Sequence, residues 1–237
     1  MMKPTELKSS TAMKPITILL AEDHTIVREG FRKMLELEPD LKVVGEAQDG
    51  RLAVSLARKL RPDVVLMDIA MPRLNGLEAT RQLRRLLPTT KILILSAHAD
   101  DAYVKDAAAS GAAGFILKQT SAHTVCEAIR QVQTGKTFFS AAVARRMHQL
   151  EDQRPHRKGQ TGGGNAKLTS REMEVLQLIA EGKANKETAA ELGISIKTVE
   201  KHRGEVMRKL DIHDTAGLTR YAISAGVIES SVQLTFV

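Results

Sequence analysis

Polar side chains able to bind a metal ion or a phosphoryl group stand directly after successive apolar runs of the chain. Glu22 and Asp23 follow the first run, and Asp68 ends the third. Ser96 and Lys118 end the fourth and fifth runs. Carboxylates gathered in one place repel each other, so such a cluster is stable mainly when a hard dication such as Mg²⁺ neutralises it. A phosphoryl group needs the same surroundings, because the metal, a hydroxyl and a lysine offset its charge. The pattern therefore predicts a magnesium site that handles a phosphoryl group.

Each of these side chains also has an ordinary structural explanation. A single acidic residue or serine after a strand is most often a helix cap or a turn former, and a single lysine is most often a solvated surface charge. All of them together, at the ends of regularly spaced apolar runs, favour the phosphoryl site. His24 and His98 lie near the same positions but have no metal-ligand spacing between them, and we interpret them as solvated residues at the rim.

The elements that must bring these residues together alternate regularly along the first part of the chain. Short apolar runs are followed five times by segments with apolar residues at helical spacing. This alternation predicts a five-stranded, doubly wound parallel sheet with helices on both faces. The strand ends meet at one edge of such a sheet, where the strand order reverses. We expect strands at Ile16–Ala21, Leu41–Ala47, Val64–Asp68, Lys91–Ser96 and Gly114–Leu117, and helices at 26–37, 53–60, 76–87, 102–109 and 121–134.

Composition excludes several classes of protein. The 237 residues are enough for two domains. No apolar run approaches the roughly 18 residues that span a bilayer, and the residues through Met13 lack the apolar core of a signal peptide. We therefore expect a cytoplasmic protein without a membrane partner. Cys126 is the only cysteine, which excludes an intramolecular disulfide and a cysteine-rich metal site.

The C-terminal part is all helical in pattern and contains a helix-turn-helix. Thr169 and Glu172 form a capping box ahead of the first helix. A short helix at 185–192, a turn at Gly193 and a longer helix at 196–210 follow. A short helix, a glycine turn and a longer helix are typical of a DNA-binding domain.

Charge favours DNA binding by the third of these helices alone. The chain has a net charge of +7, but residues 167–237 hold ten basic and ten acidic residues. Within 197–209, five basic residues face two acidic ones. Lys197, Lys201 and Arg208 share one face, opposite the apolar side of the helix. A helical dimerisation module with a solvated charged face is the alternative.

The chain divides into five consecutive parts. Residues 151–165 hold three consecutive glycines and no apolar residue, which is typical of a flexible linker. We expect a disordered N-terminal tail at 1–14, a phosphoacceptor domain at 15–140, a helix and flexible linker at 141–166, a helix-turn-helix domain at 167–230 and a C-terminal tail at 231–237.

Residues 15–135 resemble the flavodoxin-like receiver domain of bacterial two-component response regulators. Two positions depart from the usual pattern of that family: Glu22 replaces a commoner aspartate, and Gln119 stands where proline is frequent. Neither change removes a reacting group. The resemblance rests on Glu22-Asp23, Asp68, Met71-Pro72, Gly76, Ser96-Ala97, Phe115 and Lys118.

The resemblance implies a metal-dependent phosphoacceptor. Asp68 is implied to be the nucleophile that attacks the phosphohistidine of a sensor histidine kinase. Asp23, Asp68 and the carbonyl oxygen of Ala70 are implied to bind Mg²⁺, and Glu22 to act through a bound water.

The remaining implied roles belong to the residues around the phosphoryl group. Ser96 and Lys118 are implied to contact it. Phe115 is implied to be the aromatic switch residue, which rotates inward as Ser96 moves towards the phosphate.

The helix-turn-helix resembles the LuxR-type domain of NarL/FixJ regulators, on the stretches 168–172, 198–202 and 208–210. The resemblance implies that the third helix enters the major groove, with Glu200 and Lys201 nearest the base edges. The implied DNA-binding residues are Lys197, Thr198, Glu200, Lys201, His202, Arg203, Arg208 and Lys209, of which the last two contact phosphates.

Together the resemblances imply a transcription regulator that is not an enzyme. Its expected partners are the sensor kinase and double-stranded DNA, with RNA polymerase as a further candidate. A homodimer formed on phosphorylation would bind an inverted repeat, and a helix at 214–225 offers a candidate dimer strip. Either a docked, inhibited arrangement or receiver dimerisation could couple the two domains. The strip consists of Ala216, Leu218, Ala222 and Ile223.

Two rival functions use the same acidic residues. A Mg²⁺-dependent aspartyl phosphatase would also use Asp68 as nucleophile, but such enzymes usually carry a second acid two residues later, where this chain has Ala70. A receiver that binds partners without being phosphorylated would not need the complete acidic set with Ser96 and Lys118.

Overall fold

The structure is a computed structural model that describes residues 14–97, 101–139 and 168–228. Several predicted parts lie outside the described residues: the helix and linker at 141–166, His98, and both tails except Lys14. Among the described residues, no helix is long and apolar enough to cross a membrane.

The N-terminal domain is built on a parallel sheet with the strand order β2-β1-β3-β4-β5-β6. Its first five strands confirm the predicted doubly wound sheet. The sixth strand, which pairs with β5, was not predicted, because a two-residue strand is too short to show an alternating pattern. The strands are β1 (Ile16–Ala21), β2 (Leu41–Ala47), β3 (Val64–Asp68), β4 (Lys91–Ser96), β5 (Gly114–Leu117) and β6 (Phe138–Phe139).

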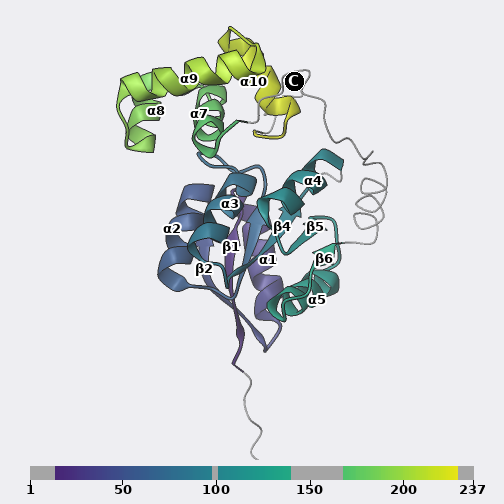
Figure 1. The fold of residues 1–237 in the computed structure, drawn as a ribbon. Coiled ribbons are helices and arrows are strands. Elements are labelled where there is room, and N and C mark those ends of the chain that lie inside the picture. Colours follow the sequence, from purple (N-terminus) through teal and green to yellow (C-terminus); the bar gives the residue numbers. More distant parts are fainter. Residues whose placement is uncertain (1–13, 98–100, 140–167, 229–237) are drawn as a thin grey trace, which may run out of the picture.

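Five helices cover the two faces of this sheet (Figure 1). Helices α2 to α4 pack on one face and α1 and α5 on the other. Side-chain caps set several helix starts: Asp49 accepts the backbone N–H of Leu52, which places the start of α2 three residues before the predicted position. The helices are α1 (Thr25–Glu36), α2 (Gly50–Leu60), α3 (Gly76–Leu86), α4 (Asp101–Ser110) and α5 (Ala122–Gln133).

Strand β3 lies at the centre of both apolar layers. Val65 and Met67 belong to the cluster under α2, α3 and α4, whereas Val64 and Leu66 belong to the cluster under α1 and α5. All five residues of β3, including Asp68, are buried. Burial on both faces explains why the strand reads as a continuous apolar run.

Gly76 allows helix α3 to begin directly against the end of β3. A Cβ atom at this position would lie 1.8 Å from the carbonyl oxygen of Asp68. The backbone N–H of Gly76 donates to the carbonyl oxygen of Ile69 at 2.8 Å. The chain therefore turns back over Asp68 within a short loop, residues 69–75, which we call the β3–α3 loop.

The C-terminal domain is a compact bundle of α7 (Ser170–Ala180), α8 (Asn185–Leu192), α9 (Ile196–Leu210) and α10 (Thr215–Ser224). The predicted capping box of Thr169 and Glu172 is present at the start of α7. Gly193 has φ +61°, the left-handed conformation that ends α8 and makes the predicted turn. The helices enclose one apolar core that includes Val175, Val199 and Leu218.

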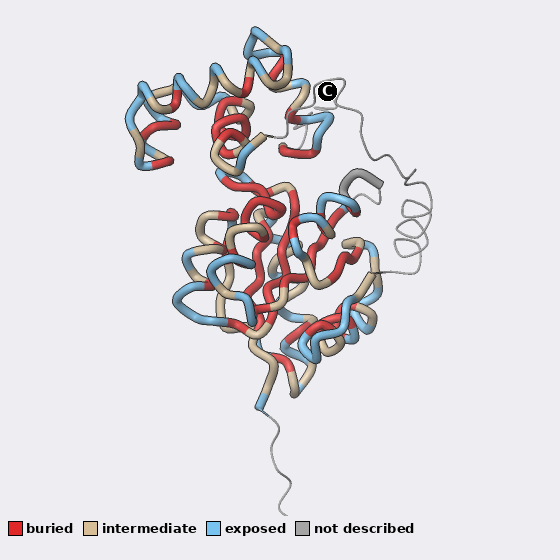
Figure 2. Tube along the Cα trace, in the orientation of Figure 1, coloured by how far each residue is buried: buried red, intermediate tan, exposed pale blue. Residues whose placement is uncertain are grey.

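The two domains meet where α7 lies over the carboxyl ends of the strands (Figure 1). Figure 2 shows buried segments at the top of the receiver directly below buried residues of α7. Helix α9 lies on the side of the helical domain that faces away from the sheet.

Candidate functional site

Carboxylates from two strand ends converge at the edge of the sheet. Glu22, Asp23, His24 and Asp68 each offer a ligand atom, and these atoms all lie within 4.8 Å of one another. Strands β1 and β3 are neighbours in the sheet, so the residues that follow β1 meet the last residue of β3. The structure thus brings together the acidic residues that the sequence analysis selected.

Lys118 connects two of these carboxylates. Its Nζ lies 2.9 Å from Oδ2 of Asp68 and 2.8 Å from Oε2 of Glu22. The backbone N–H of Lys118 donates to the carbonyl oxygen of Ser96 at 2.8 Å, which fixes the end of β5 beside the end of β4. The other oxygen of Asp68, Oδ1, accepts the backbone N–H of Ile69 at 2.8 Å.

Burial makes the charge of Asp68 costly. Its residue is 2% exposed, and Glu22 is fully buried. Removal from water, together with the neighbouring charge of Glu22, raises the pKa of Asp68 to about 6, although Lys118 opposes the shift. Glu22 and Asp68 therefore share one lysine with Asp23 close beside them, and a bound cation would relieve the repulsion among the three carboxylates.

His24 takes part in this site and is not only a solvated rim residue. Its Nδ1 lies 3.0 Å from Oδ1 of Asp23 and 3.1 Å from Oε1 of Glu22. The negative charge of Asp23 raises the pKa of His24 against the opposing effect of burial. A second missed residue is Arg28, whose guanidinium donates to the carbonyl oxygen of Glu22 at 2.7 Å. No sequence spacing marks these contacts, because they depend on how the chain turns after β1.

The remaining receiver residues line the same edge from β4 and β5. Ser96 is 3% exposed at the end of β4. Phe115 is fully buried in the apolar cluster under α2, α3 and α4. The side chain implied to rotate inward on phosphorylation therefore already lies inside the domain. Ala70, whose carbonyl was implied to bind Mg²⁺, lies in the β3–α3 loop two residues after Asp68.

Helix α9 presents an exposed polar face, as its pattern predicted. Val199 and Val206 are buried in the domain core. Thr198 and His202 are half-buried, and the Thr198 backbone N–H donates to the capping Ser195. The predicted DNA-binding residues on the exposed face are Lys197, Glu200, Lys201 and Arg208.

Two other basic residues of α9 have partners within the domain. Nζ of Lys209 lies 2.6 Å from Oε2 of Glu172, in the capping box of α7, and both side chains are largely buried. The guanidinium of Arg203 donates to Oγ1 of Thr215 at 2.7 Å and to Oδ1 of Asn185 at 3.3 Å. These contacts stabilise the packing of α9 against α7, α8 and α10, so neither side chain extends freely toward solvent.

Comparison with known proteins decides the family. The model of the response regulator receiver domain matches residues 18–130, and that of the bacterial regulatory proteins of the luxR family matches residues 166–222. The chain is 41% identical over 212 residues to the transcriptional regulatory protein LiaR of Bacillus subtilis (strain 168), a match that covers 87% of this chain and 96% of that protein. The chain belongs to the LuxR-type response regulators. It is therefore a DNA-binding transcription regulator, as the sequence predicted.

Solved structures of RcsB resemble this response regulator over both domains. One, from Salmonella enterica serovar Typhimurium, is bound to the promoter rprA in the presence of the phosphomimetic BeF3-. It is 26% identical to this regulator with a TM-score of 0.58 and covers 88% of this chain and 98% of its own. A second contains two RcsB dimers bound to two parallel DNAs, at 28% identity, a TM-score of 0.54, and coverage of 89% of this chain and 99% of its own.

The raised pKa of Asp68 predicts that this group destabilises the metal-free regulator as pH rises. The folded protein holds the Asp68 proton up to about pH 6, whereas the unfolded chain releases it near 3.8. Between these values the folded state binds more protons, so the free energy of unfolding falls with increasing pH, by at most about 3 kcal/mol from this group. Urea unfolding in a chelator at pH 4, 5, 6 and 7 measures the effect.

Asp68→Asn is the matched variant, because it keeps the shape and removes the ionisable group. Its free energy of unfolding should fall less between pH 4 and pH 6 than that of the parent. Parallel curves for the two proteins would show that Asp68 titrates normally.

Proposed function

We propose that a sensor histidine kinase switches this response regulator by phosphorylating Asp68. A carboxylate oxygen of Asp68 attacks the phosphorus of the kinase phosphohistidine, a P–O bond forms, and the P–N bond breaks as the imidazole leaves. The observation that carries the proposal is the position of Asp68 at the carboxyl end of β3, with Lys118 2.9 Å away and the carboxylates of Glu22 and Asp23 beside it. A lysine in this position offsets the charge of the added phosphoryl group.

Mg²⁺ fits the donors at this edge. Oxygen ligands from carboxylates and a backbone carbonyl are the set that Mg²⁺ prefers. Asp23, Asp68 and the carbonyl of Ala70 would hold it, with Glu22 acting through a water. When bound, the ion supplies positive charge to the phosphoryl oxygens. The gathering of the buried carboxylates of Glu22 and Asp68 with the half-buried carboxylate of Asp23, with Lys118 bonded only to the first two, supports this assignment.

Neither rival function gains support from the site. An aspartyl phosphatase would need a second acid beside the nucleophile, and the residue two positions after Asp68 is Ala70. A receiver that is never phosphorylated would not require Lys118 to reach Asp68, nor buried carboxylates that cost stability. We therefore retain phosphorylation of Asp68, with Ser96 and Phe115 as the proposed switch pair.

Acetyl phosphate with Mg²⁺ should label the regulator once, at Asp68. Asp68→Ala should abolish the label because the nucleophile is gone, and Asp23→Ala should weaken it because a metal ligand is lost. Intact-protein mass spectrometry measures the added phosphoryl mass. Asp106→Ala, which removes an exposed aspartate of α4, is the control and should label like the parent. An undiminished label on Asp68→Ala would refute the phosphoacceptor assignment.

We propose further that α9 reads the major groove of DNA as part of a dimer. The exposed Lys197, Glu200 and Lys201 lie on a helix that the receiver does not cover (Figure 1). The DNA-bound dimers of RcsB support this proposal. Lys209, paired with Glu172, is assigned to the fold of the domain instead of to a phosphate contact.

The candidate dimer strip on α10 needs correction. Leu218 and Ala222 are fully buried in the core of the helical domain, because they lie on the face of α10 that packs against α7. Ala216, Arg220 and Ile223 are exposed and fall on one helix face. This face replaces the predicted strip as the proposed dimer surface, with half-sites about one DNA turn apart.

Lys201→Ala should weaken binding to the selected operator by about 1–3 kcal/mol and relax base preference, if the side chain contacts a base edge. Arg208→Ala should instead weaken binding to all sequences and flatten the salt dependence. Genomic fragments captured by the phosphorylated regulator supply the operator, and anisotropy titrations at several salt concentrations measure both effects. Lys42→Ala, an exposed lysine of β2, is the control. Parent-like binding by both α9 variants would exclude α9 as the reader.

A further inference from the structure

A glutamine of the DNA-binding domain forms hydrogen bonds with the loop that follows the proposed phosphorylation site. The side chain of Gln177 in α7 is fully buried between the domains. Its Oε1 accepts the backbone N–H of Asn75 at 2.7 Å, and its Nε2 donates to the carbonyl oxygen of Met71 at 2.9 Å. One amide group therefore bridges the β3–α3 loop from Met71 to Asn75 and satisfies a backbone donor and a backbone acceptor of the receiver.

The part of the β3–α3 loop that Gln177 binds lies next to the proposed metal ligands. Met71 directly follows Ala70, whose carbonyl is the proposed backbone ligand, and the loop begins immediately after Asp68. The backbone N–H of Met71 also donates to the carbonyl oxygen of Ile69 at 3.1 Å. The peptide unit that carries the Ala70 oxygen is therefore held by this hydrogen bond and directly precedes the carbonyl that Gln177 binds.

A strained residue in the middle of the loop is held by the same domain. Arg73 has φ +67°, the left-handed conformation that costs a non-glycine residue about 1–2 kcal/mol. Its backbone N–H donates to Oε1 of Glu181 at 2.9 Å, and its Nη2 lies 2.6 Å from Oε1 of Glu191. Both carboxylates belong to the helical domain, so its contacts stabilise a loop conformation that the receiver alone would disfavour.

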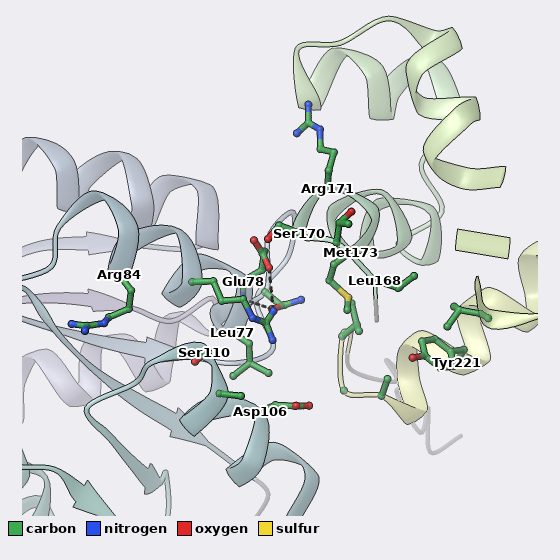
Figure 3. Close-up of a pocket in the computed structure, with 18 of the residues that line it drawn as sticks. Leu77, Glu78, Arg84, Asp106, Ser110, Leu168, Ser170, Arg171, Met173 and Tyr221 are labelled. Carbon is green, nitrogen blue, oxygen red and sulfur yellow. Dashed lines mark hydrogen bonds and ion pairs between the residues drawn. The ribbon is translucent and has the colours of Figure 1, made fainter. Parts of the chain in front are cut away.

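Other interdomain contacts do not touch the loop. Nε2 of Gln82 in α3 donates to Oε1 of Glu174 at 2.8 Å, and Nη2 of Arg51 in α2 lies 3.2 Å from Oε2 of the same residue. On the other side of α7, a cavity of about 1020 Å³ separates the receiver from α10, with Leu77 on one wall and Tyr221 on the other (Figure 3). Gln177 is therefore distinguished because its single amide group binds both a backbone donor and a backbone acceptor of the loop.

We propose that Gln177 is a positioning residue for the phosphorylation site. By fixing the β3–α3 loop from within the DNA-binding domain, it holds the Ala70 carbonyl in place and raises the affinity of the acidic site for a divalent cation. A ligand that is already ordered loses less conformational entropy when the metal binds. Because such coupling is reciprocal, the bound cation in turn strengthens the docking of α7. The inference rests on the proposed metal site of Glu22, Asp23, Asp68 and Ala70.

Binding of Mn²⁺ to the full-length protein tests the proposal, with free Mn²⁺ measured by electron paramagnetic resonance. Gln177→Met keeps the bulk and removes both loop contacts, and it should weaken Mn²⁺ binding about fivefold or more. Gln177→Asn has a side chain too short to bridge the loop and should also weaken Mn²⁺ binding. If Gln177→Met does not fold, this variant tests the effect of Gln177 on Mn²⁺ affinity. Gln82→Met is the matched control: it removes an interdomain hydrogen bond that does not touch the loop and should leave Mn²⁺ affinity unchanged. A merely structural role for Gln177 would lower the urea midpoint without changing this affinity.

Asp23→Ala separates this inference from the proposed function. If Asp23→Ala loses Mn²⁺ binding while both Gln177 variants bind like the parent, the role of Gln177 is refuted and the proposed metal site stands. If Gln82→Met weakens binding as much as Gln177→Met, docking in general is responsible, and the role of Gln177 is again refuted. If Asp23→Ala binds Mn²⁺ like the parent, the metal site itself is wrong and both proposals fall.

Discussion

Repulsion among three carboxylates at one end of a parallel sheet is the constraint on which the functional part of this structure depends. Glu22, Asp23 and Asp68 lie in a largely buried cluster, in which Lys118 contacts Glu22 and Asp68 and His24 contacts Asp23. In a medium of low dielectric such repulsion is costly, and the raised pKa of Asp68 reflects it. A cation or a proton relieves this cost. The electrostatic repulsion within the site therefore changes when a metal ion or a phosphoryl group binds.

Asp68 is followed directly by the short β3–α3 loop, which belongs to the receiver and is bonded by the helical domain. Gly76 lets α3 return directly over Asp68, and the loop between them is tied to α7 by Gln177 and to α7–α8 through Arg73. The DNA-binding domain is consequently docked on the segment closest to the chemistry. Its reading helix, α9, faces away from the receiver (Figure 1). Docking therefore restricts the orientation of the helical domain and the pairing of two copies, and it leaves the face with Lys197 and Lys201 open.

Features set by local pattern were predictable from the sequence. The buried strand ending at Asp68, the capping box of Thr169 and Glu172 and the glycine turn at Gly193 each depend on a few consecutive residues, and the structure confirms them. A strand buried on both faces reads as an apolar run whichever helices cover it. The convergence of Asp68 with Lys118 followed from the topology, because parallel strands end at one edge.

Features set by tertiary contact were not predictable. Gln177 lies on an amphipathic helix at a position that reads as an ordinary polar residue, and its role is visible only once α7 lies on the β3–α3 loop. Lys209 carries the charge expected of a phosphate contact, yet it pairs with Glu172. Leu218 and Ala222 have the pattern of an exposed strip but pack on α7. In each case the partner is distant in sequence, and no spacing encodes it.

Amide hydrogen exchange in the full-length protein tests most directly the claim that phosphorylation site and DNA-binding domain share one loop. Peptides that cover the β3–α3 loop and α7 should be followed before and after addition of acetyl phosphate with Mg²⁺. The account predicts that both peptides change protection together, and that Asp68→Ala abolishes both changes. A change confined to the loop, with α7 unaltered, would contradict the account.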